Sequence, residues 1–375
     1  DIAMAAEPTV AYGTKERQIN GSNLTDSLLD LRYGSGYNKF KGQIEAYWFL
    51  SRTPNWFRLH ASYTDDIDNG VSQVGEVSQD NIFSVGIRKK GVSRKFLRVK
   101  DFRFEVLKDL GKGFSGELFI AHRQNDPMLN LPFSYFFTDK KGPSSLTNFE
   151  VAFKLRFAYL ERFFESDYFR TSLGTRFPVI ELMVSKGIKG VFNSSYDYTK
   201  VYGAVKDRIK IAPYGSFSYK VYGGLINKTL PFTYLENHPG NDLYYYNNNS
   251  FNLMNRFEYL SDKYAGVNIE HNIGSGIFRF IPVTRKLKFR QFWNVKSLWG
   301  SLSKENYALN NTANIILKHP ERVFKTLNNS AYIEVGTGID NILKVFRIDL
   351  VWRLSPTSAP TASKFGVFGS FQLHF

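Results

Sequence analysis

Charged residues that could pair with one another recur in the last third of the chain, along the segments 251–260, 263–272 and 286–299. The polar side of these segments carries Arg256, Glu258, Glu270, Lys288 and Arg290. Consecutive strands are usually neighbours in an antiparallel sheet, so acidic and basic side chains would meet across them. We expect a ladder of salt bridges that braces the wall of the sheet. Alternatively, the ladder anchors the segment 225–250 or lines a conduction path.

The histidines are the next candidates for chemistry, and none lies in a nucleophile motif. They are His60, His122, His238, His271, His319 and His374. His271 follows Glu270, but adjacent residues of a strand point to opposite faces, so the pair cannot act as a dyad. The sequence also shows no cluster of metal-ligating residues. We therefore expect no enzymatic activity, no catalytic residue, no metal site and no cofactor.

The segment 225–250 is longer than a hairpin connection needs. It contains His238, Gly240 and Asn241, followed by a run of tyrosines and asparagines. Pro, Gly and Asn are typical turn residues. Long irregular segments between strands are either solvated loops or functional segments that fold inward. The sequence leaves both interpretations open, and His238, Gly240 and Asn241 are the candidate residues of a functional loop.

The composition suits a sheet that crosses a membrane. The 375 residues include 34 Phe and 22 Tyr and no cysteine, yet the mean hydropathy is −0.30. No apolar run reaches the length of about 18 residues that a membrane helix needs. The formal charge is +15, but the basic residues are dispersed rather than clustered, which argues against a nucleic-acid partner. Dispersed charges suit the polar interior of a barrel, or contact with anionic lipid headgroups.

Alternation of apolar and polar residues predicts a single all-β domain with about sixteen antiparallel strands. The expected strands are 27–35, 42–51, 55–64, 81–90, 101–108, 112–124, 148–159, 176–186, 196–210, 213–224, 251–260, 263–272, 286–299, 329–338, 343–354 and 364–375. Ile315–Thr326 is the best candidate for a helix, and Pro320 interrupts it. An even number of strands places both termini on the periplasmic side of a bacterial barrel.

The alternation also assigns faces to the strands. In 345–354, the apolar residues Phe346, Ile348, Leu350, Trp352 and Leu354 oppose Arg347, Asp349 and Arg353. An apolar face opposite a charged face is the lipid-out, polar-in pattern of a transmembrane barrel. A soluble β-sandwich has the same local alternation. The length and number of the strands and the carboxy terminus favour the membrane.

The chain ends on an alternating segment whose apolar face includes Phe371, Leu373 and Phe375. Bacterial outer-membrane barrels commonly end on such an aromatic strand, which closes the sheet against the first strand. Closure has a physical cause, because each unpaired backbone group in hydrocarbon costs several kcal/mol. We expect Phe371, Leu373 and Phe375 to lie on the closing strand.

Several longer segments carry a family resemblance: Leu230–Asn241, Phe251–Tyr264, Arg285–Arg290, Tyr332–Ile342 and Phe346–Arg353. Together they resemble a family of Bacteroidota outer-membrane barrels of unassigned function, over about residues 100–375. In that family a carboxypeptidase-like regulatory domain commonly precedes the barrel. The resemblance implies that this chain is the barrel portion, and residues 1–20 are expected to be a disordered or expression-derived lead-in.

The end of that family is in turn similar to the BamA-like surface-antigen superfamily of barrel assembly and secretion proteins. This similarity implies a weak seam between the first and last strands and an inward loop with an Arg-Gly-aromatic motif. The present loop departs from that pattern, because it reads Pro239-Gly240-Asn241 and contains no Arg-Gly.

We expect a transmembrane barrel of the bacterial outer membrane that acts in outer-membrane protein or lipid biogenesis or translocation. The seam would pair with the edge of another polypeptide. The alternatives are a passive channel or uptake component, and a surface barrel that binds glycans through its tyrosine-rich loops. The expected partners are outer-membrane lipid and lipopolysaccharide, and unfolded outer-membrane proteins or lipoproteins.

Overall fold

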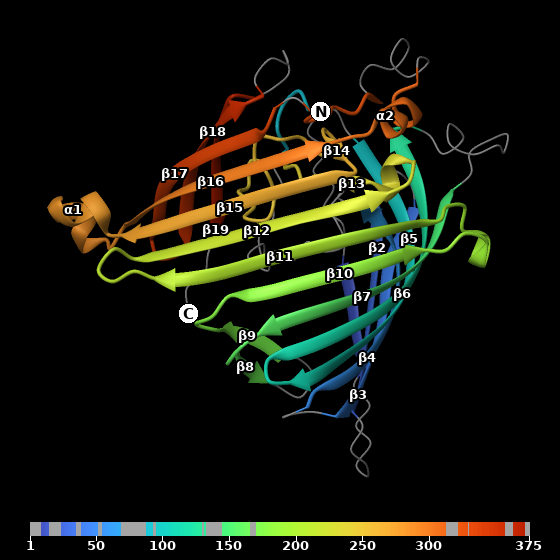
Figure 1. The fold of residues 1–375 in the computed structure, drawn as a ribbon. Coiled ribbons are helices and arrows are strands. Elements are labelled where there is room, and N and C mark those ends of the chain that lie inside the picture. Colours follow the sequence, from blue (N-terminus) through green and yellow to red (C-terminus); the bar gives the residue numbers. More distant parts are fainter. Residues whose placement is uncertain are drawn as a thin grey trace. The chain divides into compact units, whose positions relative to one another are not determined.

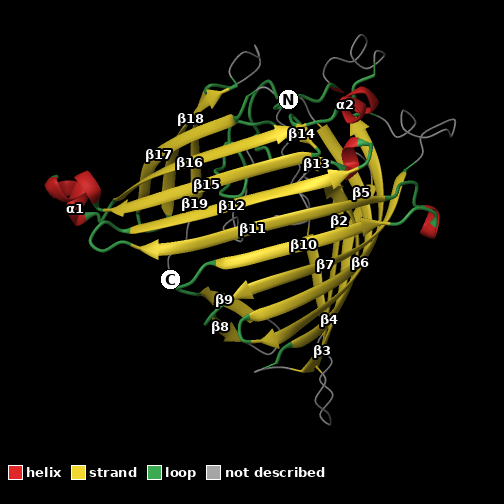
Figure 2. Cartoon of the chain, in the orientation of Figure 1, coloured by secondary structure: helices red, strands yellow, loops and turns green. Residues whose placement is uncertain are grey.

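The computed structural model describes residues 9–14, 24–34, 39–51, 55–68, 88–92, 95–129, 131–132, 145–165, 170–312, 322–328, 330–356 and 363–371. The chain forms two compact units. The first contains Asp1–Asp68 and Phe96–Val201, and the second contains Asn69–Lys95 and Tyr202–Phe375. Strands dominate the described part of both units, as the yellow arrows in Figure 2 show. The prediction of an all-β chain is therefore confirmed.

In the first unit, antiparallel strands follow one another in chain order, and a separate hairpin is inserted before the last of them. They are β1 (Thr9–Thr14), β2 (Leu24–Gly34), β3 (Lys39–Ser51), β4 (Phe57–Asp68), β5 (Lys95–Gly111), β6 (Phe114–Leu129), β7 (Leu146–Ala158) and β10 (Val179–Gly187), with β8 (Arg162–Glu165) and β9 (Arg170–Gly174) as the hairpin and η2 (Val191–Asn193) as a short 3-10 turn. Gly113 permits the tight turn after β5, because its φ is 87° and a Cβ there would lie 2.8 Å from the carbonyl oxygen of Ala158.

The second unit repeats this arrangement with consecutive antiparallel strands. They are β11 (Tyr198–Lys210), which belongs to this unit from Tyr202 onward, β12 (Ser216–Asn227), β15 (Lys263–Gly274), β16 (Arg290–Ser301), β17 (Tyr332–Ile342), β18 (Phe346–Ser355) and β19 (Phe365–Phe371). β15 to β18 lie side by side in Figure 1. The connections contain η3 (Phe232–Tyr234), the two-residue strands β13 (Glu236–Asn237) and β14 (Leu260–Ser261), η4 (Gly276–Phe280), α1 (Pro282–Lys286) and α2 (Lys304–Asn310).

The two faces of the strands have the opposite character to those of a soluble sheet. In β18 the charged residues are buried, with Arg347 and Arg353 at 3% and Asp349 at 0% exposure. The apolar residues of the other face are exposed: Phe346, Ile348, Trp352 and Leu354. β10 repeats the pattern, with Ile180, Leu182 and Val184 exposed and Glu181 and Ser185 buried. The faces predicted for 345–354 are confirmed, and the exposed apolar face is what lipid would cover.

A helical membrane span is not found among the described residues, since none of their helices is long and apolar enough to cross a bilayer.

The connection between β12 and β15 forms the core of the second unit. We call residues 228–262 the buried loop. Phe251, Met254 and Tyr259 of the loop pack with Leu298 of β16, with Tyr332 of β17, and with Leu327 in the connection before β17. Tyr246 and Leu253 pack with Val351 of β18 and Phe368 of β19. In Figure 1 this yellow-to-gold connection folds back across β15 and β16. The interpretation of 225–250 as a solvated loop is therefore wrong.

One of the expected strands is absent from its predicted place, and most of another lies outside the described residues. Residues 251–260 form an irregular buried segment rather than a wall strand, and β15 has β12 as its neighbour instead. Residues 81–87 lie outside the described residues, and Arg88 makes an isolated antiparallel bridge with Leu243 of the buried loop. Most of the candidate helix 315–326 also lies outside the described residues. The closed barrel, its strand number and the side of its termini stay predictions.

Candidate functional site

The strongest constellation of polar side chains lies where the buried loop meets β16 and β17. Glu334 of β17 is 1% exposed. Its Oε2 accepts a hydrogen bond from the backbone N–H of Asn252 at 2.8 Å, and its Oε1 accepts one from Leu253 at 2.6 Å. The carboxylate therefore holds the backbone of the loop directly, and a charged acceptor of this kind makes strong hydrogen bonds.

Lys296 of β16 holds the other side of the same turn. It lies opposite Glu334 in the register of β16 and β17. Its Nζ donates to the carbonyl oxygens of Asn247 at 3.0 Å, Asn248 at 2.9 Å and Ser250 at 2.6 Å. An ammonium group has three donors, so these carbonyls satisfy it completely. The cross-strand pair of Lys296 and Glu334 thus clamps the loop by its own backbone, and we call it the loop clamp.

Two of the predicted loop residues contribute to the internal structure of the buried loop. Asn241 donates from Nδ2 to the carbonyl of Tyr245 at 2.7 Å and to Oδ1 of Asn252 at 2.8 Å. At Gly240, a Cβ would lie 2.3 Å from the carbonyl oxygen of Asn255, so a larger residue would push the two turns apart. Asn241 and Gly240 therefore shape the loop rather than face solvent.

The third predicted loop residue, His238, forms a buried pair with Ser261. Its Nε2 lies 2.8 Å from the hydroxyl of Ser261, and its ring packs edge-on against Tyr264 at 5.4 Å between centroids. Burial lowers the pKa of His238 to about 3, so the imidazole is neutral at physiological pH. A Ser–His pair could in principle act as nucleophile and base. Ser261 is 0% exposed, however, and such a weakly basic imidazole would be a poor base, so the geometry supports a structural role.

A short segment before β5, which contains Arg88 and Lys89, contacts the buried loop at Asp242. Arg88 forms an ion pair with Asp242 at 3.3 Å, and the backbone N–H of Lys89 donates to the carbonyl of Asp242 at 2.8 Å. The Nζ of Lys89 donates to the carbonyl oxygens of Asn241 and Asn252. Burial lowers the pKa of Lys89 to about 8. This contact was not predicted, because nothing in the sequence of 81–90 distinguishes it from a wall strand.

The predicted charge ladder does not form, because its members lie in separate places. Glu258 belongs to the buried loop and pairs with Lys325 at 2.9 Å and Arg353 at 3.4 Å. Although burial opposes ionisation, these two cations hold the pKa of Glu258 below its ordinary value. The backbone N–H of Arg256 donates to Asp242 at 3.0 Å. Arg256 and Glu258 are thus on a loop, not on a strand next to β15.

The remaining members of that ladder are also apart. Glu270 of β15 pairs with Arg347 of β18 at 2.8 Å, and Arg347 also pairs with Asp349. Lys288 precedes β16, where its carbonyl accepts from Asn341, and Arg290 begins β16 opposite Asp340. Among the described ion pairs, none joins Lys288 or Arg290 to Glu258 or Glu270. The ladder prediction was wrong because it treated 251–260 as a wall strand.

The predicted closing strand, 364–375, is described in part. Phe371 ends β19 and lies opposite Phe346 of β18, and the two rings pack at a tilt of 49° with 4.6 Å between their centroids. Its side chain is 37% exposed on the outward face, as expected. Leu373 and Phe375 lie outside the described residues.

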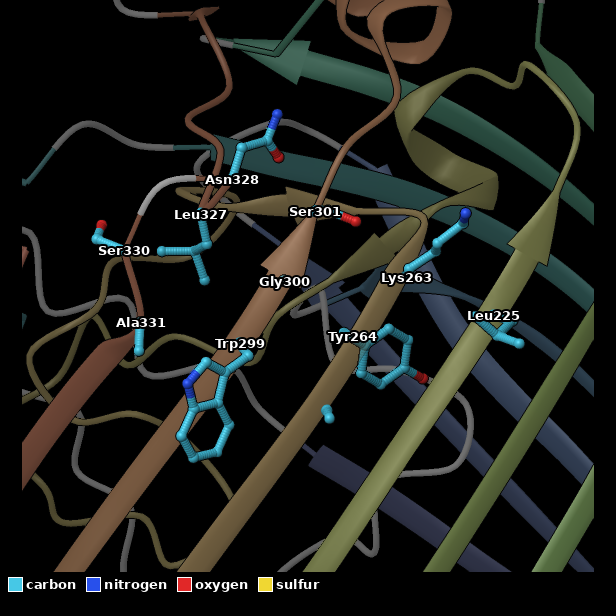
Figure 3. A pocket seen from close by; sticks show the side chains of 11 residues that line it. Leu225, Lys263, Tyr264, Trp299, Gly300, Ser301, Leu327, Asn328, Ser330 and Ala331 are labelled. Carbon is cyan, nitrogen blue, oxygen red and sulfur yellow. The ribbon is translucent and has the colours of Figure 1, made fainter.

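A shallow hollow of about 540 Å³ lies at the ends of β12, β15 and β16 (Figure 3). Leu225, Lys263 and Trp299 line it together with Asn328 and Ser330. Trp299 is 50% exposed, so an aromatic face and a cation are both open to contact there.

In the described part of the chain, no group of three or more His, Asp or Glu side chains could hold a metal ion.

Comparison with known proteins agrees with this fold. The chain has 10% identity and a TM-score of 0.52 to the structure of BamA from Haemophilus ducreyi lacking POTRA domains 1–3, over 98% of this chain and 70% of that one. CdiB from Acinetobacter baumannii has 8% identity and a TM-score of 0.48, over 98% of this chain and 56% of that one. CdiB from Escherichia coli has 10% identity and a TM-score of 0.48, over 97% of this chain and 62% of that one. No curated protein matches the sequence.

The similarity to BamA concerns the fold, because an identity of 10% is too low to carry function. A match to a sequence family shows a relation that the fold comparison does not. Residues 4–308, most of the chain, match the C-terminal domain of a family of unknown function, DUF5686. The chain therefore belongs to the DUF5686 C-terminal domain family and has a fold similar to that of the BamA barrel.

Proposed function

We propose that this chain is an integral barrel of the bacterial outer membrane that takes part in the assembly or translocation of other outer-membrane components. The proposed role is non-catalytic. Its proposed partners are unfolded outer-membrane proteins or lipoproteins, together with the lipid and lipopolysaccharide that surround it. We further propose, from the family resemblance, that the protein comes from a member of the Bacteroidota and that a carboxypeptidase-like domain precedes the barrel.

The inverted burial of the strands supports the membrane location. In β18 the charged Asp349 is buried on one face and the apolar Trp352 is exposed on the other. An apolar face exposed in this way is unfavourable in water unless something covers it. Lipid covers such a face over its whole height, whereas a partner protein would cover a limited patch. The exposed Trp299 and Lys263 at the strand ends suit the interface with lipid headgroups, where aromatic and basic residues gather.

The loop clamp is the observation that favours assembly over passive conduction. The two charges of the clamp are occupied: Lys296 is bonded to three loop carbonyls, and Glu334 to two loop amides. Charges engaged in this way are poorly placed to set the ion preference of a water-filled path. A loop fixed to the wall by its backbone suits a device that positions a strand edge.

Depletion of the protein in its native bacterium tests the proposal. Outer-membrane proteins and lipopolysaccharide are quantified in purified outer membranes by mass spectrometry, before and after depletion. An assembly role predicts that several barrel proteins or the lipopolysaccharide fall together while their mRNA stays constant. A channel or uptake role predicts unchanged outer-membrane composition and loss of growth on particular nutrients, and that result would contradict the proposal.

The two alternatives can be separated on purified protein. A channel predicts a steady conductance in planar bilayers that changes when Arg290 is replaced with Gln. A glycan-binding barrel predicts that replacement of exposed loop tyrosines such as Tyr244 removes sugar binding and keeps the fold.

A further inference from the structure

The connection between β15 and β16 leaves large apolar side chains uncovered. We call residues 275–289 the basic turn; they contain η4 and α1, and α1 lies beyond the ends of the two strands in Figure 1. The side chains of Phe280 and Val283 are 74% and 66% exposed, and those of Ile281 and Leu287 are also exposed. Apolar side chains that gather in this way mark a surface that something else covers.

The basic turn is closed by its own hydrogen bonds and by one pair of rings. The N–H of Phe278 donates to the carbonyl of Ser275 at 2.8 Å, and the hydroxyl of Thr284 donates to the carbonyl of Phe278 at 2.9 Å. The ring of Phe278 packs edge-on against Phe289, with 6.0 Å between centroids. These contacts hold the backbone without using Phe280, whose side chain is left on the outside of the turn.

The basic turn carries positive charge and no acidic residue. Arg279, Lys286 and Lys288 are exposed, and the sequence of 275–289 contains neither Asp nor Glu. The guanidinium carbon of Arg279 lies 4.7 Å from the ring centre of Phe280, so a cation stands directly beside the apolar surface. Among the described residues, no ion pair engages these three cations. The turn therefore offers an apolar surface and uncompensated positive charge at one place.

The surface next to the basic turn leads to the outward face of the wall. Tyr214, in the turn between β11 and β12 at the same end of the sheet, is exposed, and its carbonyl oxygen lies 2.9 Å from Nε2 of His271. His271 points to the face opposite Glu270 and lies between Phe217 and Trp293 in the register of β12, β15 and β16. Its ring is edge-on to both, at 6.2 Å and 5.6 Å between centroids. A row of aromatic rings across strands is typical of the membrane interface of a barrel.

We propose that the basic turn is an interfacial anchor that lies on an anionic phospholipid surface and binds its headgroup phosphates. Phe280 and Val283 enter the boundary between headgroups and acyl chains, while Arg279 and Lys286 stay at the level of the phosphates. Lipid provides both the apolar and the negative partner that this surface requires, and it is continuous with the lipid that covers the wall. The inference rests on the membrane location in the proposed function and not on the assembly role.

The lengths of the connections in this unit indicate which leaflet the basic turn meets. At the other end of the strands the connections 228–262 and 302–331 are long, whereas 211–215 and 343–345 at this end are short. Bacterial barrels keep their short turns on the periplasmic side. The expected partner is therefore phospholipid of the inner leaflet, whose anionic members, such as phosphatidylglycerol, attract basic residues.

A single fluorescent label tests where the basic turn lies. The chain has no cysteine, so Phe280→Cys provides the only thiol, and a polarity-sensitive fluorophore attached there reports whether it is in lipid or in water. The full chain is folded into phosphatidylcholine vesicles with or without phosphatidylglycerol, and only inserted protein is measured. With phosphatidylglycerol, the label should be quenched by lipids that carry a nitroxide near the headgroup and should be shielded from acrylamide. Glu305→Cys on α2, beyond the opposite end of β16, is the control and should stay accessible to acrylamide in both vesicles.

The role of the cations is tested in the same labelled protein. Arg279→Gln with Lys286→Gln should lower the ratio of shielded to water-exposed label about twentyfold in phosphatidylglycerol vesicles, because each basic residue near an anionic surface contributes roughly fivefold in affinity. High salt should lower the ratio as well, since it screens the attraction. Lys228→Gln with Lys304→Gln removes two exposed lysines at the other end of the strands and should leave the ratio unchanged.

Three results would overturn the proposal. The label stays in water in both kinds of vesicle, its shielding depends neither on phosphatidylglycerol nor on the two cations, or it becomes shielded only when periplasmic proteins are added, as a protein-docking surface would. A chain that fails to insert would overturn the membrane location and this inference with it. A shielded label, combined with normal outer-membrane composition after depletion, would retain the anchor and overturn the assembly role alone.

Discussion

Glu334 and Lys296 are the residues through which the sheet holds the buried loop. Each is almost fully buried and bonds to backbone groups of the loop, and Glu334 also accepts a hydrogen bond from the hydroxyl of Tyr332. Side-chain contacts tolerate many sequences, but a backbone contact fixes the position of the chain whatever residues it carries. The polar turn 247–253 therefore needs an acid and a base at these two positions of the wall.

Glu334→Gln should destabilise the protein by about 2 to 3 kcal/mol. The amide would place an N–H group against one of the loop amides, where a charged acceptor now stands, and buried hydrogen bonds to charged groups are worth about that much. Thermal melting in detergent should show the fall. Glu305→Gln on the exposed face of α2 is the control and should melt like the parent. Equal melting of the two variants would rule out the loop clamp.

His238 should make the stability of the protein depend on pH. Its pKa falls from about 6.5 in the unfolded chain to about 3 in the fold, so the fold favours the neutral ring. This contribution is fully present above pH 6.5 and is lost as the pH falls toward 3. Between pH 7 and pH 4 the loss should approach about 3 kcal/mol.

Melting curves from pH 7 to pH 4 test this expectation. His238→Gln should be less stable at pH 7 and should have a flatter pH dependence than the parent. His122→Gln, at a residue that contacts the carbonyl of Phe192, is the control and should keep the slope of the parent. An identical slope in His238→Gln and the parent would show that His238 is not the titrating group.

At the level of elements, alternation predicted the wall strands well and the buried loop poorly. The faces of 345–354 were predicted correctly, because only one orientation of such a strand places all its apolar side chains on the same face of the sheet. The segment 251–260 has a similar mixture of apolar and charged residues, but among the described residues it pairs with other connecting segments, such as Asn237 opposite Leu260, and not with a wall strand. Pairing is a property of the whole sheet, so local alternation could not distinguish a strand from an irregular buried segment.

The sequence likewise predicted some residues of the candidate site and missed others. Asn241, Gly240 and His238 lie together in the buried loop, as the turn composition suggested. Glu334 was not predicted as a functional residue, although it lies on the same buried side of β17 as Tyr332 and Gly336. Its role depends on the fold of Asn252 and Leu253, 82 and 81 positions away. A single sequence does not show which loop reaches which strand.

Two acidic residues of the expected ladder should differ in their contribution to stability. Glu258 is 5% exposed and stands between Lys325 and Arg353, so Glu258→Gln leaves Arg353 buried without its ion-pair partner. Loss of one partner of a buried pair costs about 3 to 5 kcal/mol. The side chain of Glu270 is 30% exposed, and its partner Arg347 keeps Asp349. Glu270→Gln should therefore cost about 1 kcal/mol or less.

The same melting experiment compares these two variants directly. A larger fall for Glu258→Gln supports a loop that is locked to β18. A larger fall for Glu270→Gln would mean that the wall between β15 and β18 contributes more than the loop contact.

For the whole molecule, the exposed apolar faces should respond to charge according to depth in the membrane. Leu182 lies in the middle of β10 and is 53% exposed. Leu182→Arg should reduce stable insertion by about 2 to 4 kcal/mol, because arginine at the bilayer midplane costs that much. Ile209 is similarly exposed but lies at the end of β11, and Ile209→Arg should cost about 1 kcal/mol or less.

Urea titration of the protein folded into lipid vesicles measures both variants. In water, an exposed leucine can be replaced by arginine with little effect on stability, so a soluble protein would tolerate both changes equally. Equal stability of the two variants would therefore contradict a lipid-facing surface.

Photo-cross-linking in the native outer membrane tests the proposed function most directly. A photoactivatable phenylalanine replaces Phe371, at the edge of β19, and in a second strain it replaces Leu182, on the outward face of β10. The account predicts adducts with unfolded outer-membrane proteins from position 371 and none from position 182. A correctly inserted protein that gives no such adducts from position 371, or equal adducts from both positions, would contradict it.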